Sequence, residues 1–324
     1  MTFSFSLTVL ITFLSKLGLE TFYPNKLTLR SLLEINKNSI NEEAASSVQK
    51  IPWCFLRKLF KLNAECRGCT QVSNSEDNEE SSDPLELDLY TADESADNEV
   101  NPLDLVTALF LCADSFLQQE MALKMTMCQF SVPLLMPHVN NSQSTLMLWA
   151  LRDIVKEWCP HLSESRDFVE NHIVQAKIPL YSFVRLQNCG LSKSQMLNQV
   201  LILGQQNHNI FIHREMKGGA IERHISNGLA EVYWYLPRGR EHPDVFPDPI
   251  AFANLRGNIS ESLAQFTFLF QVSTATFVFL DKIEKEEHEI LTSLQDVKSK
   301  LFLVVNRKDG SSKEDMESVK KTVK

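Results

Sequence analysis

The feature that most constrains this chain is a strand, a loop and a helix in succession within residues Tyr181–Asn198. The loop carries Lys193 and Ser194 directly before the helix, where phosphate-binding loops of the pattern G-x-x-x-x-G-K-S/T place the same residue types. Gln187 and Ser192 stand where that pattern has its two glycines. Glycine is needed there because a side chain obstructs the approach of backbone N–H groups to the phosphates. The sequence therefore predicts a phosphate-binding loop in outline, without its glycines.

After Lys177 the chain alternates between strands and helices, which indicates a largely parallel sheet with helices on both faces. The expected strands are Tyr181–Leu186, Leu229–Leu236, Ile250–Leu255, Thr276–Leu280 and Lys300–Asn306. The expected helices are Ser192–Leu203, Ser260–Gln271, Lys282–Ser299 and Lys313–Lys324. Two successive strands after the first helix are typical of a Ras-like GTPase. We therefore interpret residues 177–324 as a degenerate GTPase-like α/β domain, truncated at its C-terminus because no final strand and helix precede Lys324.

Two further loops of such a domain can be located. A GTPase has D-x-x-G after its third strand, and this chain has Asn254 in place of the acid while Gly257 is kept. An amide binds magnesium poorly compared with a carboxylate. After the last expected strand, where N/T-K-x-D reads guanine, Asn306 and Asp309 keep the spacing, although N-x-x-D is also an ordinary turn. The candidate cofactor-binding residues are Lys193, Ser194, Asn254, Gly257, Asn306 and Asp309.

The losses fall mainly on contacts to phosphate and metal. The sequence therefore predicts no catalytic residue, no metal site and no hydrolysis. The candidate cofactor is GTP or GDP with Mg²⁺, for which the degenerate motifs predict weak binding.

Three segments precede the α/β domain. Residues 1–67 are expected to form a small helical module, because their leucines recur at helical spacing. Residues 68–100 are rich in acidic side chains and contain no Lys or Arg, which predicts a disordered linker. Residues 101–176 are expected to form a helical domain that begins with Asn101 as N-cap and Pro102 in the first turn. Within it we expect two helices up to Pro137 and a third from Ser144 through Trp158.

Two other stretches are open to more than one interpretation. The insert Gly204–Asn227, at the position of a GTPase's first switch, is expected to be a mobile, solvated loop, with a metal site formed by His208, His213 and His224 as the alternative. A methionine stripe is interpreted as core, with an adaptable binding surface as the alternative (Met121, Met125, Met127 and Met136).

Composition narrows the function further. The net charge of −9 and the absence of a Lys/Arg-rich block argue against a nucleic-acid partner. The apolar run Met1–Leu14 is too short to span a bilayer and is expected to begin a buried helix, so no membrane partner is predicted. Seven cysteines without a repeating spacing favour a reducing, cytoplasmic location over a disulfide scaffold.

Several unusual blocks occur in order along the chain: 101–105 NPLDL, 114–120 DSFLQQE, 127–130 MCQF, 192–198 SKSQMLN, 234–237 WYLP and 255–257 LRG. With them, the chain resembles the family of the up-regulator of cell proliferation and the interferon-induced very large GTPases, from about Ser15 to Lys324. In that family the intact phosphate loop lies further towards the C-terminus. The resemblance therefore implies an N-terminal portion that carries a degenerate GTPase-like domain. It also implies a cytoplasmic and nuclear location and a link to cell growth or the interferon response.

Together these observations predict a mixed fold, with N-terminal all-α modules followed by the α/β domain. The expected function is that of a pseudo-GTPase and interaction region, an assembly or scaffold module acting through protein partners or self-association. The alternative is an atypical GTP-binding protein that uses the loop Gln187–Ser194. A third interpretation is an adaptor that acts through residues 7–67.

Overall fold

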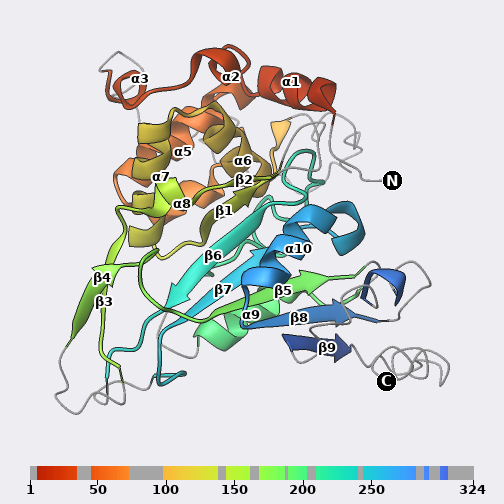
Figure 1. Cartoon of the computed structure of the whole chain (residues 1–324). Coiled ribbons are helices and arrows are strands. Elements are labelled where there is room, and N and C mark those ends of the chain that lie inside the picture. The colour runs from red at the N-terminus through yellow and green to blue at the C-terminus, as the bar shows by residue number, and fades with distance from the viewer. Residues whose placement is uncertain are drawn as a thin grey trace, which may run out of the picture.

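The computed structural model describes residues 6–34, 45–72, 98–137, 144–160, 168–186, 189–202, 209–239, 244–281, 288–291 and 300–305. Within these ranges the chain is a mixed α/β protein whose N-terminal part is helical. Figure 1 shows these N-terminal helices beside one end of a large sheet.

The described strands of the large sheet follow the order β2-β1-β6-β7-β5-β8-β9. Strand β5 is parallel to both of its neighbours, β7 and β8, and β9 is parallel to β8. The remaining pairs, β6 with β7, β1 with β6 and β1 with β2, are antiparallel. The strands span Val132–Met136 (β1), Thr145–Leu146 (β2), Leu180–Arg185 (β5), Ala230–Tyr235 (β6), Ile250–Leu255 (β7), Ala275–Leu280 (β8) and Leu301–Val305 (β9).

The strands expected from the sequence after Lys177 are confirmed, with ends shifted by at most one residue. Two expected helices are confirmed as α9 (Lys193–Ile202) and α10 (Leu263–Val272). Of the helix expected at 282–299, the structure describes one helical turn at 288–291. The helix expected at 313–324 lies outside the described residues.

Two hydrophobic clusters cover opposite faces of the sheet. In β7 the alternation is visible: Ala251, Ala253 and Leu255 belong to the larger cluster, and Phe252 belongs to the smaller one. Successive residues of a strand point to opposite faces, so a single strand feeds both cores. Helix α10 packs in the larger cluster and α9 in the smaller one, which puts them on opposite faces. Figure 1 shows α10 in front of the strands.

The helical N-terminal part shares the larger core. Its elements are α1 (Leu7–Lys16), α2 (Phe22–Asn25), α3 (Leu29–Leu33), η1 (Val48–Lys50), α5 (Ile51–Phe60) and η2 (Ala64–Gly68). Helices α6 (Pro102–Cys112) and α7 (Ser115–Met127) follow. The expected start of α6 is confirmed, because the Asn101 side chain accepts a 2.9 Å hydrogen bond from the N–H of Leu103. Almost every residue of α6 is buried, as expected for a helix that is apolar all round.

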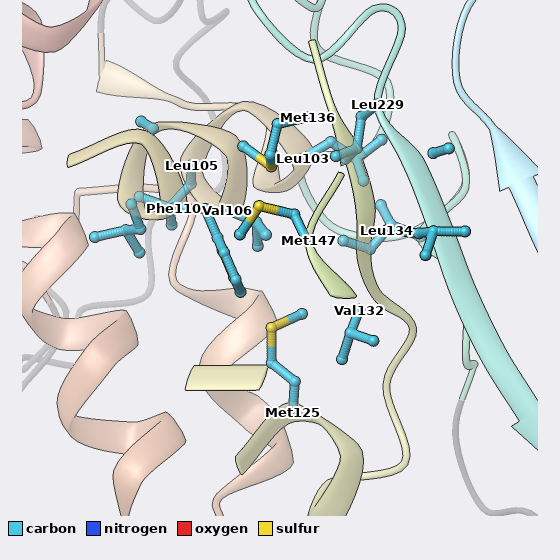
Figure 2. Packing of buried hydrophobic residues seen from close by; sticks show 14 of the residues in the cluster. Leu103, Leu105, Val106, Phe110, Met125, Val132, Leu134, Met136, Met147 and Leu229 are labelled. Atoms are coloured by element: carbon cyan, nitrogen blue, oxygen red, sulfur yellow. The ribbon is translucent and has the colours of Figure 1, made fainter. Parts of the chain in front are cut away.

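Figure 2 shows how α6, α7 and β1 meet in this core, where Met125 and Met136 lie among Leu103, Val106 and Val132. Met121, Met125 and Met136 are buried and Met127 is exposed. The interpretation of the methionine stripe as core is therefore confirmed for three of its four members.

Three expectations for residues 101–176 are wrong at the level of individual elements. The stretch before Pro137 ends in β1, and Gln129 leaves α7 with a left-handed backbone (φ 58°). A short apolar run does not distinguish a buried strand from a buried helix by periodicity. The region Ser144–Trp158 is not one helix but β2, the short helix α8 (Leu148–Leu151) and β3 (Val155–Trp158). Strand β3 pairs with β4 (Val169–His172) in a separate antiparallel hairpin. The segment 101–176 is therefore not all-helical.

The division of the chain into four parts stays a prediction. The larger cluster runs continuously through the N-terminal helices, α6, α7 and the sheet. Most of the acidic segment, residues 73–97, lies outside the described residues.

Candidate functional site

Four of the predicted residues meet at one edge of the sheet. Lys193 and Ser194 form the first turn of α9, directly after the loop that follows β5. Asn254 and Gly257 lie at the end of β7, the parallel neighbour of β5. The carboxyl ends of parallel strands share one edge, and ligands of open α/β sheets bind there. Gln187, Asn306 and Asp309 lie outside the described residues.

The hydroxyl of Ser194 is fully engaged by protein groups. Its Oγ accepts hydrogen bonds from Asn254 Nδ2 at 3.1 Å and from Arg256 Nη1 at 2.7 Å. A serine hydroxyl has two acceptor lone pairs, so both are used. All three side chains are buried. In this arrangement Ser194 has no lone pair left for a metal ion, and a guanidinium lies where the phosphate-loop pattern would place magnesium.

Arg256 is held by a second set of contacts. Its Nε donates to Glu231 Oε2 in a buried ion pair, and its Nη1 also donates to the carbonyl of Ile212 at 2.7 Å. Glu231 Oε1 accepts from Ser131 Oγ at 2.8 Å. The β6–β7 ladder places Glu231 directly opposite Asn254, so strand register brings the acid to this edge. The charge of Arg256 is thus balanced inside the protein.

Lys193 is turned into the protein rather than towards solvent. Its Nζ donates to the carbonyl of Phe183 at 3.1 Å and to that of Leu255, at the ends of β5 and β7. Burial lowers the pKa of Lys193 well below its usual value, and the nearby charge of Arg256 lowers it further. The ammonium therefore ties two strand ends together.

A cavity of about 220 Å³ opens beside these groups. Its lining contains the β5–α9 loop from Cys189, the first turn of α9 and the residues that follow β7. The described lining residues include five cations and no acid: Arg185, Lys193, Arg214, Arg223 and Arg256. Burial, with the charges of Arg256 and Arg185, lowers the pKa of Arg223 to about 10. The cavity is therefore strongly electropositive.

One wall of the cavity comes from the segment after α9, and hydrogen bonds hold both ends of the described part of this segment. The carboxylate of Asp104 in α6 accepts from the N–H groups of His224 (2.7 Å), Ile225 (3.1 Å) and Ser226 (2.8 Å). Asn198 exchanges two hydrogen bonds with the backbone of Phe211, at 2.8 and 2.9 Å. In residues 209–227, the described part of the insert, the ends are buried and bonded to two helices, whereas the middle is partly or fully exposed, so the expectation of a solvated loop is wrong only for the ends.

Sequence reasoning missed Arg256, Glu231 and Asp104. A signal existed for Glu231, since an acid inside the apolar strand Ala230–Tyr235 requires a buried partner. Asp104 occupies a fully buried helix position, where a carboxylate needs hydrogen-bond donors. Arg256 directly precedes Gly257 of the N-x-x-G motif, and only the structure shows that its side chain bonds to Ser194.

Comparison with known proteins identifies the family. A family model described as "Up-regulator of cell proliferation-like domain" matches residues 100–324, and one described as the "Up-regulator of cell proliferation-like, N-terminal domain" matches residues 10–86. The chain belongs to the up-regulator of cell proliferation family. It is 39% identical to the human up-regulator of cell proliferation over 329 residues, which covers 96% of this chain and 35% of that protein.

More distant relatives share the same region. The chain is 36% identical to human caspase recruitment domain-containing protein 6 over 248 residues, or 75% of this chain and 24% of that protein. It is 30% identical to human interferon-induced very large GTPase 1 over 322 residues, or 92% of this chain and 13% of that protein. The chain spans about a third of the length of its up-regulator relatives.

No solved structure matches the chain at the threshold applied to these comparisons. In the part of the chain that the structure describes, no helix has the length and apolar character needed to cross a membrane. Within the same ranges, no group of three or more His, Cys, Asp or Glu side chains is arranged to hold a metal ion.

Proposed function

We propose that this chain is a pseudo-GTPase module, a GTPase-like domain that does not hydrolyse GTP and serves protein assembly. The observation that carries the proposal is the 2.7 Å hydrogen bond from Arg256 to Ser194. It places a permanent cation, neutralised by Glu231, where a working phosphate loop needs an exchangeable magnesium ion. A side chain cannot leave and return with each nucleotide as a metal ion does.

Three observations support the GTPase-like part of the proposal. The chain order β5, α9, β6, β7, α10, β8 is the order expected from the sequence for such a domain. Lys193 and Ser194 begin the helix after β5, as in a phosphate loop. A relative at 30% identity is named a very large GTPase.

The assembly part rests on exposed apolar surface. Large apolar side chains are exposed along the stretch from β2 through α8 to the β3–β4 hairpin (Leu146, Leu148, Trp149, Val155, Phe168 and Val169). Such concentrations of exposed apolar residues mark protein contact sites more often than chance. A relative whose name includes a caspase recruitment domain also supports a role in protein–protein contacts. We propose self-association through this stretch, which we call the hairpin surface.

Hydrolysis is tested by phosphate release from GTP by the full chain, with magnesium and with EDTA. We expect no release above that of a heat-denatured sample. Magnesium-dependent release that is lost in Lys193→Ala and kept in the exposed control Lys217→Ala would overturn the proposal.

The replacement of the metal is tested separately with Asn254→Asp, which restores the acid of the D-x-x-G motif. Because Arg256 still donates a hydrogen bond to the hydroxyl of Ser194, we expect the thermal midpoint of unfolding of this variant to be the same with magnesium as with EDTA. A magnesium-dependent rise in the midpoint would show that the metal site is intact, and would contradict our interpretation of Arg256.

Self-association is tested by size-exclusion chromatography with light scattering. We expect a concentration-dependent oligomer that Trp149→Ser together with Phe168→Ser shifts towards the monomer. The control Val272→Ser changes an equally exposed apolar residue on α10 and should leave the oligomer intact. A monomer at all concentrations would count against the assembly role.

We further propose a cytoplasmic and nuclear location. No disulfide joins the seven cysteines, all of which lie in the described residues, and this suits a reducing compartment. Imaging of a tagged chain tests this proposal, and a secretory distribution would contradict it.

A further inference from the structure

Two residues that line the cavity beside α9 carry buried nitrogen atoms without a hydrogen-bond partner among the described residues. Arg256 is only 5% exposed, lines the cavity, and has a buried Nη2 with no hydrogen-bond partner among the described residues. The Nδ1 of His213, another lining residue, is likewise buried without a partner there. Buried polar atoms are rarely left unbonded, and each one costs about 1–3 kcal/mol. Both atoms belong to residues that line one basic cavity, which favours a ligand that accepts hydrogen bonds.

The charges around the cavity define the sign of that ligand. Five cationic side chains line it, and Glu231 balances the charge of one of them, Arg256. Glu231 is bonded to Arg256 and Ser131, and Asp104 to three backbone N–H groups. Asp281 adds one negative charge beside the loop, because its Oδ2 accepts from Gly190 N at 3.0 Å. The remaining positive charge favours an anion.

The N-terminus of α9 adds to this field. The helix begins at Lys193, and Ser192, Lys193 and Ser194 all line the cavity. The first N–H groups of a helix have no intrahelical acceptor and carry a partial positive charge, which favours bound phosphate. The first turn of α9 and the side chains of Arg185, Arg214 and Arg223 therefore line one volume.

We propose that this cavity binds the phosphate group of a small phosphorylated ligand through nitrogen donors alone, without a metal ion. Arg256 and His213 bind it from the buried side, and Arg214 and Arg223 close the outer side. Guanidinium groups match the oxygen geometry of phosphate and carry the charge that magnesium would otherwise supply. The volume of about 220 Å³ is below the roughly 300–1,000 Å³ of pockets that enclose a drug-sized ligand. It therefore suits one or two phosphoryl groups rather than an enclosed nucleoside.

This inference concerns the same site as the proposed function but does not depend on it. The proposed function fails if the chain hydrolyses GTP or does not assemble. The phosphate site fails only if no anion binds in the absence of metal. A hydrolysing or monomeric protein can still bind phosphate, so the two failures are distinguishable.

The test is calorimetric titration of the full chain with inorganic phosphate, pyrophosphate and GTP, each with magnesium and with EDTA. We expect pyrophosphate to bind in EDTA with an affinity within about two-fold of that in magnesium. Binding that requires magnesium, or no binding by any of the three, would overturn the proposal.

Variants show whether the anion occupies this cavity. Arg214→Gln removes an exposed cation at the mouth, so it should fold normally, and Arg223→Gln removes a half-buried one. Each is expected to weaken pyrophosphate binding about ten-fold or more, since a charged donor is lost. The control Arg152→Gln changes an exposed arginine that does not line the cavity and should leave binding unchanged. Equal binding by all three variants would reject the site.

Comparison of the ligands identifies the source of the phosphate group. If GTP binds no more tightly than pyrophosphate, the phosphoryl groups alone are recognised. If GTP binds more tightly, again in EDTA, the phosphate group belongs to a nucleotide whose base extends beyond the cavity. If guanosine binds as tightly as GTP, the phosphate contributes nothing and the proposal is wrong.

Discussion

The guanidinium of Arg256 lies 2.7 Å from the hydroxyl oxygen of Ser194, although the two residues are 62 positions apart in the chain. Ser194 begins α9 and Arg256 follows β7, so the contact exists because β5 and β7 are parallel neighbours. The same guanidinium reaches back to Glu231 on β6. One arginine thus links residues at the ends of three strands, and its guanidinium bonds the serine that a phosphate-loop pattern assigns to magnesium.

The buried pair of Arg256 and Glu231 predicts a large loss of stability when one partner is removed. Glu231→Gln leaves an uncompensated buried charge, which costs about 3–5 kcal/mol. Urea denaturation measures the free energy of unfolding of the variant. The control Glu170→Gln changes an exposed acid on β4 and should alter stability by less than about 0.5 kcal/mol. Equal stability of the two variants would show that the pair is not formed.

We expect one cavity wall to open more easily when the carboxylate of Asp104 is replaced. Asp104→Asn replaces one acceptor oxygen by an NH₂ group that faces backbone donors, with an expected loss of about 1.5–3 kcal/mol. Hydrogen exchange should speed up at the amides of His224, Ile225 and Ser226 beyond the change in global stability. The exposed control Asp153→Asn should leave these amides protected. Unchanged protection in the Asp104 variant would contradict the three hydrogen bonds.

We expect the same cavity wall to be displaced when a side chain is added at Gly219. A Cβ at this position would lie 2.1 Å from the backbone oxygen of His213, so Gly219→Ala must displace the segment that carries His213. The expected cost is about 1–3 kcal/mol, as for overpacking, together with weaker pyrophosphate binding. Gly68→Ala is a matched control, because a Cβ there meets nothing within 4 Å. Thermal midpoints of the two variants should therefore differ, and similar midpoints would refute the clash.

His213 predicts a pH dependence of stability. Burial is the largest effect and lowers the pKa of His213. The charge of Glu215 opposes this shift, and the charges of Arg256 and Arg67 lower the pKa further. Its folded-state pKa is therefore below the value of about 6.5 in the unfolded chain. Between the two values the unfolded chain binds more protons, so stability is complete above about pH 6.5 and falls as the pH decreases below it.

Denaturation at about pH 7.5 and pH 5.5 measures this effect. His213→Gln removes the titration, so the variant should lose less stability on acidification than the wild type. His172→Gln, on the exposed strand β4, should behave as the wild type does. An unchanged acid sensitivity in the His213 variant would show that other groups cause it.

Local sequence patterns were enough to predict the strands after Lys177, the helices α9 and α10 and the start of α6. The strands β5 to β9 are short, apolar and bounded by turn residues, and Asn101 with Pro102 forms a helix N-terminus whatever packs against it. These predictions succeeded because their causes act within a few residues of the chain. The strand β1 was missed because its burial on both faces removes the alternation that would identify it.

The amino-acid order alone thus determines that Lys193 and Ser194 begin a helix after a strand, and that Asn254 replaces an acid. Which cation meets Ser194 was decided only by the tertiary structure. The pairing of β5 with β7, and of β6 with β7, brings Arg256, Glu231 and Asn254 to one edge. Such contacts depend on strand order and register, which arise from packing between residues far apart in the chain, and no local pattern records them.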